Sequence, residues 1–146
     1  MTPAAGHPVP DLNGFAATQA AIDIVSDLTA DDMVIFLLSG GGSALFERPL
    51  ISPNEMMGIT RQLLACGADI TEINTIRKRL SGVKGGRFAR TCSPAKVFQI
   101  VLSDIVGDPL DMIASGPACE DESTSEEAAA IAEKYSLRLS DKATQF

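Results

Sequence analysis

Three successive glycines between two serines form the first segment of this sequence that could do chemistry. Residues 38–45 read Leu-Ser-Gly-Gly-Gly-Ser-Ala-Leu. Because glycine adopts positive φ angles without strain, consecutive N–H groups of such a loop can converge on one anion. The two serine hydroxyls add further donors. The pattern predicts a cofactor-binding loop for a phosphate or similar anion, made of Ser39, Gly40, Gly41, Gly42 and Ser43.

Two other interpretations of this loop remain open. Ser43 could be a nucleophile, but the G-x-S-x-G pattern is absent and His7 is the only histidine, which disfavours a Ser-His-Asp hydrolase. The loop could also be a tight turn that binds no ligand. It is neither a Walker A loop nor a G-x-G-x-x-G loop, because both patterns are missing.

A cluster of basic residues lies in the middle of the chain. Six of the twelve lysines and arginines fall between residues 77 and 90 with no acidic residue among them: Arg77, Lys78, Arg79, Lys84, Arg87 and Arg90. Such side chains can neutralise a phosphate or a carboxylate. Arg79 and Lys84 flank the break at Ser81–Gly82 and are the best candidates for catalytic cations. The alternative is a solvated helix face.

Two aspartates follow the second apolar segment of the chain, residues 96–102. Asp104 comes almost directly after it, and Asp108 lies four residues further on, before Pro109. Carboxylates after a strand suit Mg²⁺ that is held largely through water and phosphate. Asp104 is therefore the candidate metal ligand, and Asp108 is a candidate catalytic residue that could orient a hydroxyl nucleophile. Alternatively, Asp108 only caps the helix that Pro109 begins.

These segments are spaced by elements of an expected α/β fold. The apolar runs 33–38 and 96–102 are typical of parallel strands covered on both faces. Helices are expected over residues 11–28, 53–66, 69–80 and 126–135, with a short one from Arg87. The strand–helix–strand order favours a partial Rossmann-like parallel sheet flanked by helices. The glycine loop follows a strand, where open α/β sheets bind ligands.

Only two strands can be predicted, which is few for an independent sheet. A doubly wound sheet needs further strands to cover both edges. Either strands are missed by the patterns or the chain is a piece of a longer protein, and we expect the second. Residues 1–146 are then part of a single Rossmann-like domain.

The composition excludes several classes of function. A net charge of −7 argues against a general nucleic-acid binder. No apolar run approaches 18 residues, so no membrane span is expected, and the first residues lack the pattern of a signal peptide. The three cysteines show no C-x-x-C spacing and are typical of reduced thiols in a cytoplasmic protein.

Taken together, the motifs resemble the glycerate 2-kinase family. The resemblance rests on four segments in order: His7-Pro8-Val9-Pro10-Asp11, the glycine loop in residues 38–45, the basic segment 74–87, and residues 102–108 with 113–117. Members of this family join a Rossmann-like N-terminal domain of the DUF4147 type to a C-terminal MOFRL domain. The resemblance implies ATP-dependent phosphorylation of D-glycerate to 2-phosphoglycerate, with Mg²⁺ as cofactor.

The resemblance also implies that residues 1–146 lack parts of the family's active site. Family members are much longer, and neither the lysine of an upstream Gly-Lys-Ala segment nor an arginine from the MOFRL domain is present. We therefore expect residues 1–146 to be inactive alone and to need the remainder of the N-terminal domain and a MOFRL domain. Two alternatives stay open. One is a hydroxypyruvate reductase, a common label in the family, and the other is a non-catalytic anion-binding fragment.

Overall fold

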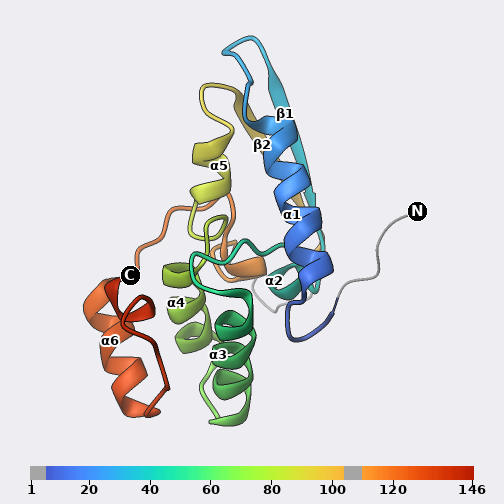
Figure 1. Cartoon of the computed structure of the whole chain (residues 1–146). Coiled ribbons are helices and arrows are strands. Elements are labelled where there is room, and N and C mark those ends of the chain that lie inside the picture. Colours follow the sequence, from blue (N-terminus) through green and yellow to red (C-terminus); the bar gives the residue numbers. More distant parts are fainter. Residues whose placement is uncertain (1–5, 104–109) are drawn as a thin grey trace.

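The computed structural model describes residues 6–103 and 110–146 and shows helices packed beside a small sheet (Figure 1). In chain order the elements are α1 (Leu12–Val25), β1 (Met33–Leu38), α2 (Gly42–Leu45), α3 (Pro53–Ala65), α4 (Ile70–Leu80), α5 (Arg87–Thr91), β2 (Lys96–Val101), η1 (Ile113–Ser115), α6 (Ser125–Lys134) and η2 (Ala143–Gln145). β1 and β2 pair in parallel, with Ile35 opposite Phe98. The predicted α/β class, with a parallel sheet flanked by helices, is confirmed.

The four longer helices, α1, α3, α4 and α6, begin at side-chain caps. Asp11 accepts a hydrogen bond from the amide of Gly14 at the start of α1, and Asp69 and Glu72 form a capping box at the start of α4. Such caps satisfy N–H groups that a helix leaves unpaired. α1 has 14 residues. Among the described residues, no helix combines the length and the apolar character needed to cross a membrane.

One face of the sheet packs against α1 and α5. The ring of Phe36 lies 5.2 Å from that of Phe46 and 4.7 Å from that of Phe88, in a core that includes Ile22 and Val25 of α1. In Figure 1 the two strands stand behind α1, along one side of the molecule. Alternate residues of each strand therefore enter this core, as the pleat of a strand requires.

The other face of the sheet is exposed. Its apolar side chains, between 52% and 74% exposed, are Met33, Ile35, Leu37, Phe98, Ile100 and Leu102. The expectation that both strands are covered on both faces is wrong for the described residues. The described helices that pack on the sheet lie on one side of it, and the second row of apolar side chains has no described cover.

A second core joins α3, α4 and α6 at the other end of the molecule (Figure 1). The buried members that α3 and α4 contribute are Met56, Ile59, Leu63, Ile73, Ile76 and Leu80. The connection between α4 and α5 links the two cores, because Leu80 belongs to this helical core and Val83 to the core under the sheet. The basic segment of the sequence therefore runs through the centre of the molecule.

Candidate anion-binding site

The glycine loop follows β1 and turns sharply into α2. Gly41 has a φ of +84°, a conformation that strains any other residue. Gly42 is packed so closely that an added Cβ would lie 2.8 Å from the Cβ of Ala114 and 2.9 Å from the Cδ1 of Leu38. Among the described residues, no acceptor contacts the amides of Gly40 and Gly41. Within the described part of the chain, these two donors are available to a ligand.

A pocket of about 250 Å³ opens against this loop. Ser39, Gly40, Gly41 and Ser43 line it, and Gly42 lies buried behind them. The other walls are made by His7 and Pro8, by Leu64, Ile70 and Arg77, and by Met112, Ile113 and Ala114. The structure thus brings four of the five predicted loop residues together around one cavity. It also places His7, the single histidine of the chain, in the wall of this cavity.

The pocket wall that packs against α2 is a left-handed turn. Ala114, Ser115 and Gly116 all have positive φ, at 51°, 60° and 62°, which is costly for the two residues that carry a Cβ. Contacts from the basic segment hold the turn in place. The Ser115 hydroxyl donates to the Oδ1 of Asn74 at 2.8 Å, and the Gly85 amide donates to the Ser115 carbonyl at 3.1 Å.

Lys84 lies beneath the glycine loop and has no exposed surface. Its ammonium donates to the carbonyls of Ser43, Phe46 and Ala114 at 3.0, 3.1 and 3.3 Å. An ammonium has three donors, and all three are used. Lys84 therefore ties the glycine loop to the left-handed turn and does not line the pocket. Its predicted role as a catalytic cation stays a prediction, and this geometry favours a positioning role.

Glu47 is the acidic partner of Lys84 in the interior. Its Oε2 atom lies 3.6 Å from the Lys84 ammonium, and both side chains are almost wholly buried. Burial raises the pKa of Glu47 and lowers that of Lys84, while the charge of each partner opposes the effect of burial on the other. Sequence reasoning did not single out Glu47, since an isolated glutamate after a loop is usually solvated.

Arg77 is the cation that lines the pocket. Its side chain is only 6% exposed, and the described residues form neither a hydrogen bond nor an ion pair with it. Burial lowers the pKa of Arg77, and the charge of Glu47 opposes this from a longer range. Sequence reasoning preferred Arg79 and Lys84, although helical spacing from Ile73 and Leu80 was a signal that Arg77 faces inward.

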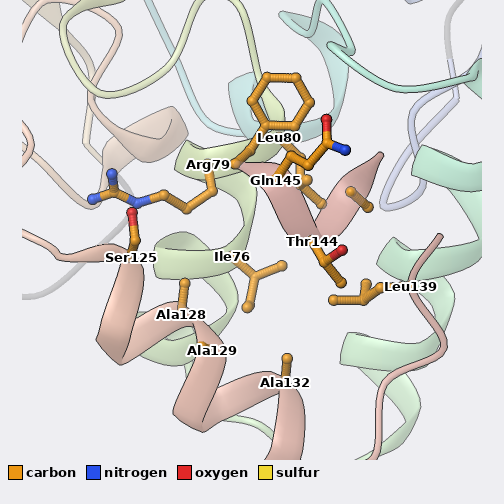
Figure 2. Close-up of a pocket in the computed structure, with 12 residues that line it drawn as sticks. Ile76, Arg79, Leu80, Ser125, Ala128, Ala129, Ala132, Leu139, Thr144 and Gln145 are labelled. Carbon is orange, nitrogen blue, oxygen red and sulfur yellow. The ribbon is translucent and has the colours of Figure 1, made fainter. Parts of the chain in front are cut away.

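Arg79 faces a different part of the molecule. Its guanidinium lies 3.2 Å from Asp121 and donates to the carbonyl and the hydroxyl of Ser123. Figure 2 shows it beside Ser125 at the start of α6, at the rim of an apolar pocket of about 270 Å³. The structure therefore does not bring Arg79 together with the glycine loop. Its catalytic role stays a prediction that the described geometry does not favour.

Asp104 and Asp108 lie outside the described residues, so their predicted roles stay predictions. β2 delivers the chain close to the glycine loop, because Val101 pairs with Leu38 and the amide of Leu102 donates to the Leu38 carbonyl at 2.8 Å. Among the described residues there is no cluster of three or more histidine, cysteine, aspartate or glutamate side chains that could hold a metal ion. A magnesium site therefore has no support from the described part of the chain.

Comparison with known proteins gives close relatives. A protein from Thermotoga maritima named D-glycerate 2-kinase is 55% identical over 139 residues, which are 94% of this chain and 33% of that protein. A protein from Agrobacterium vitis named for hydroxypyruvate reductase is 44% identical over 137 residues, which are 92% of this chain and 36% of that protein. This chain spans about a third of the length of these relatives.

The fold has an equally close structural relative. The crystal structure of glycerate kinase from Thermotoga maritima matches with a TM-score of 0.92 and 54% identity, over 97% of this chain and 34% of that one. Residues 1–146 also match the family DUF4147, described as a domain of unknown function, along their whole length. The chain therefore belongs to the DUF4147 family.

Proposed function

We propose that this chain is part of an ATP-dependent D-glycerate 2-kinase, which converts ATP and D-glycerate to ADP and 2-phosphoglycerate. The observation that carries the proposal is the glycine-loop pocket, placed at the end of β1 in a chain 55% identical to a protein named D-glycerate 2-kinase. Phosphoryl transfer depends on positioning and charge neutralisation more than on a covalent nucleophile. The pocket offers amide donors, serine hydroxyls and a buried cation, which suit that task.

In this proposal the residues of the chain divide between binding and support. Ser39 and Ser43, with the amides between them, hold an anionic group of one substrate. Lys84 and Glu47 support the loop from below. The Lys84 ammonium donates to the carbonyl of Ser43 in the loop at 3.0 Å and to the carbonyl of Phe46, just after α2, at 3.1 Å. We propose that Asp108 orients the glycerate hydroxyl, and this role rests on the sequence alone.

In this proposal Mg²⁺ is held by Asp104 and by phosphate oxygens of the substrate. A magnesium ion would neutralise the phosphate charge during transfer. The described residues provide no cluster for it, so no step is assigned to the metal.

The exposed sheet face supports the proposal that further polypeptide completes the domain. Six apolar side chains gather there, and a contiguous apolar patch is usually covered by a partner. Because relatives are about three times longer, we assign the cover to other segments of the same Rossmann-like domain. A MOFRL domain is the second expected partner, the proposed location is the cytoplasm, and residues 1–146 alone are expected to be inactive.

A product assay on the complete gene product tests this function. With ATP and D-glycerate we expect equimolar ADP and phosphoglycerate, with the phosphate on the 2-hydroxyl as identified by NMR. Consumption of NAD(P)H with hydroxypyruvate, and no ADP with glycerate, would instead support the reductase alternative suggested by the name of the Agrobacterium vitis relative. No turnover of either kind, with retained phosphate binding, would support a non-catalytic anion-binding module.

A further inference from the structure

Arg77 combines two properties that rarely occur together. Its side chain is 6% exposed, so it is removed from bulk solvent, yet it lines the pocket of the glycine loop. No hydrogen bond or ion pair to it is formed by the described residues. A buried charge without a partner is unfavourable, so a site with this composition is stabilised by an anion that enters it.

The charges beneath the pocket do not cancel within the described chain. Lys84 and Arg77 supply two positive charges, and Glu47 supplies one negative charge at 3.6 Å from Lys84. Lys84 is also held by three carbonyls. Glu47 therefore serves chiefly to balance Lys84, and the guanidinium of Arg77 remains as the surplus charge at the pocket.

The other cations between positions 77 and 90 are already engaged or exposed. Lys78 lies 3.7 Å from Asp111 and 3.6 Å from Asp121, and Arg79 lies 3.2 Å from Asp121. Arg87 donates to the carbonyl of Ser81 at 2.7 Å, and Arg90 is exposed. Of the six basic residues between positions 77 and 90, Arg77 is thus the one whose described surroundings leave its charge for a ligand.

We propose that Arg77 binds the anionic group of the ligand in the glycine-loop pocket. A guanidinium presents paired N–H donors that match the oxygens of a carboxylate or a phosphate. Gly40 and Gly41 line another wall of the same cavity, and among the described residues no acceptor contacts their amides. A cavity of about 250 Å³ accommodates such a group more readily than a whole nucleotide. The identity of the ligand, D-glycerate or the phosphates of ATP, rests on the proposed function. The inference that Arg77 binds an anion does not depend on that function.

Equilibrium binding to the complete gene product tests this role without requiring turnover. Calorimetric titrations with D-glycerate, with a non-hydrolysable ATP analogue and with inorganic phosphate are compared for the wild type and for Arg77→Met. We expect the Kd of Arg77→Met to rise about 10- to 100-fold for inorganic phosphate and for at least one of the other two ligands. If Arg77→Met weakens D-glycerate binding, Arg77 binds the carboxylate of glycerate. If it weakens binding of the ATP analogue, Arg77 binds a phosphate of the nucleotide.

Arg90→Met is the matched control, because it removes an exposed arginine from the same run of basic residues, positions 77 to 90. Its Kd values should stay within about 2-fold of the wild type, as expected for a solvated charge. If Arg77→Met also stays within that range for all three ligands, Arg77 does not bind the anion. A wild type that binds phosphate through Arg77 but forms no phosphoglycerate would reject the proposed function and leave this inference standing.

A structure of the wild type decides the matter if Arg77→Met does not fold, as judged by loss of cooperative thermal unfolding. The complete protein is crystallised with D-glycerate or with the ATP analogue. Anion oxygens within hydrogen-bonding distance of the Arg77 guanidinium support the proposal. A carboxylate of the protein paired with Arg77, with the ligand bound elsewhere, overturns it.

Discussion

Arg77 and Arg79 stand two residues apart on α4, yet they serve two different regions of the molecule. Arg77 faces the glycine-loop pocket, where the described residues leave it without an ion pair. Arg79 faces the start of α6, where Asp121 and Ser123 hold it. Two residues correspond to about 200° around a helix of 3.6 residues per turn. The face of the helix, and not closeness to the glycine break, decides which cation can reach a ligand.

The two regions also differ in how their charges are satisfied. Beneath the glycine loop, Lys84 and Glu47 are buried and fixed, and they support a loop whose own amides are available. At the start of α6, Asp121 holds the buried Lys78 and the partly exposed Arg79 at 3.6 and 3.2 Å. The first region is a buried frame beneath amides that no described acceptor contacts, whereas the second is a network of ion pairs. Substitutions in the two regions should therefore have effects of different size.

The largest effect is expected for Lys84→Met. This change leaves Glu47 buried without its ion-pair partner and removes three hydrogen bonds to carbonyls. Breaking a buried pair from one side typically costs about 3–5 kcal/mol. We expect a loss of that size in the free energy of unfolding, measured by urea denaturation.

The double variant Lys84→Met/Glu47→Leu separates the buried charge from the lost hydrogen bonds. The double variant buries two apolar side chains and leaves no uncompensated carboxylate. Its free energy of unfolding should therefore be about 2 kcal/mol higher than that of Lys84→Met. A loss below about 1 kcal/mol for the single variant would show that Lys84 does not support the loop in the way described.

Gly42→Ala should have the next largest effect. The new methyl group would lie 2.8 Å from Ala114 and 2.9 Å from Leu38, and overpacking of this kind costs about 1–3 kcal/mol. Gly58→Ala is the control, since Gly58 lies inside α3 and has no heavy atom within 4 Å of its added Cβ. It should stabilise the protein by about 0.5–1 kcal/mol. Equal shifts in thermal unfolding would mean that the loop is not tightly packed.

Arg79→Met should have a smaller effect on stability than either change at the glycine loop. Its ion pair with Asp121 is partly exposed, with 18% and 13% of the two side chains accessible. Such pairs contribute about 1 kcal/mol or less and weaken with added salt. Urea denaturation at low and high ionic strength should show this dependence. A loss above about 3 kcal/mol would place Arg79 in a buried network comparable to that of Lys84.

The smallest effect concerns Glu72, which joins α4 to the end of α6. Hydrogen bonds from Lys134, Tyr135 and the amide of Asp69 lower the pKa of Glu72 to about 2, from an ordinary value of 4.5. A carboxylate with a lowered pKa stabilises the fold above its unfolded pKa, and that contribution is lost as the pH falls. The stability difference between the wild type and Glu72→Gln should be constant above about pH 5 and shrink towards pH 2. A difference that does not change with pH would contradict this assignment.

Much of the fold could be predicted because its elements carry local signals. The apolar run 33–38 gives the bounds of β1, and the helices expected from residues 53 and 69 begin within one residue of α3 and α4. The four-residue helix α2 was not predicted, because one turn shows no periodicity. The positive φ angles of Ala114 and Ser115 could not be predicted either, since contacts from distant residues impose them.

The candidate site was predicted only in part, for a similar reason. The glycine loop carries its own conformational signal, and four of its five residues line the pocket. Which cation accompanies it depends on the face that α4 turns toward the loop and on partners such as Glu47 and Asp121, which are far apart in the sequence. A strand covered on one side also cannot be told from a fully buried strand by an apolar run alone.

Turnover by Arg77→Met and Arg79→Met, compared in the complete gene product, tests the central claim most directly. The assay measures kcat/KM for D-glycerate at saturating ATP, and for ATP at saturating D-glycerate. We predict that Arg77→Met lowers at least one of the two values about 10- to 100-fold, while Arg79→Met changes both by less than about 3-fold. The opposite order, with Arg79→Met the more damaged enzyme, would contradict the account and return the catalytic role to Arg79.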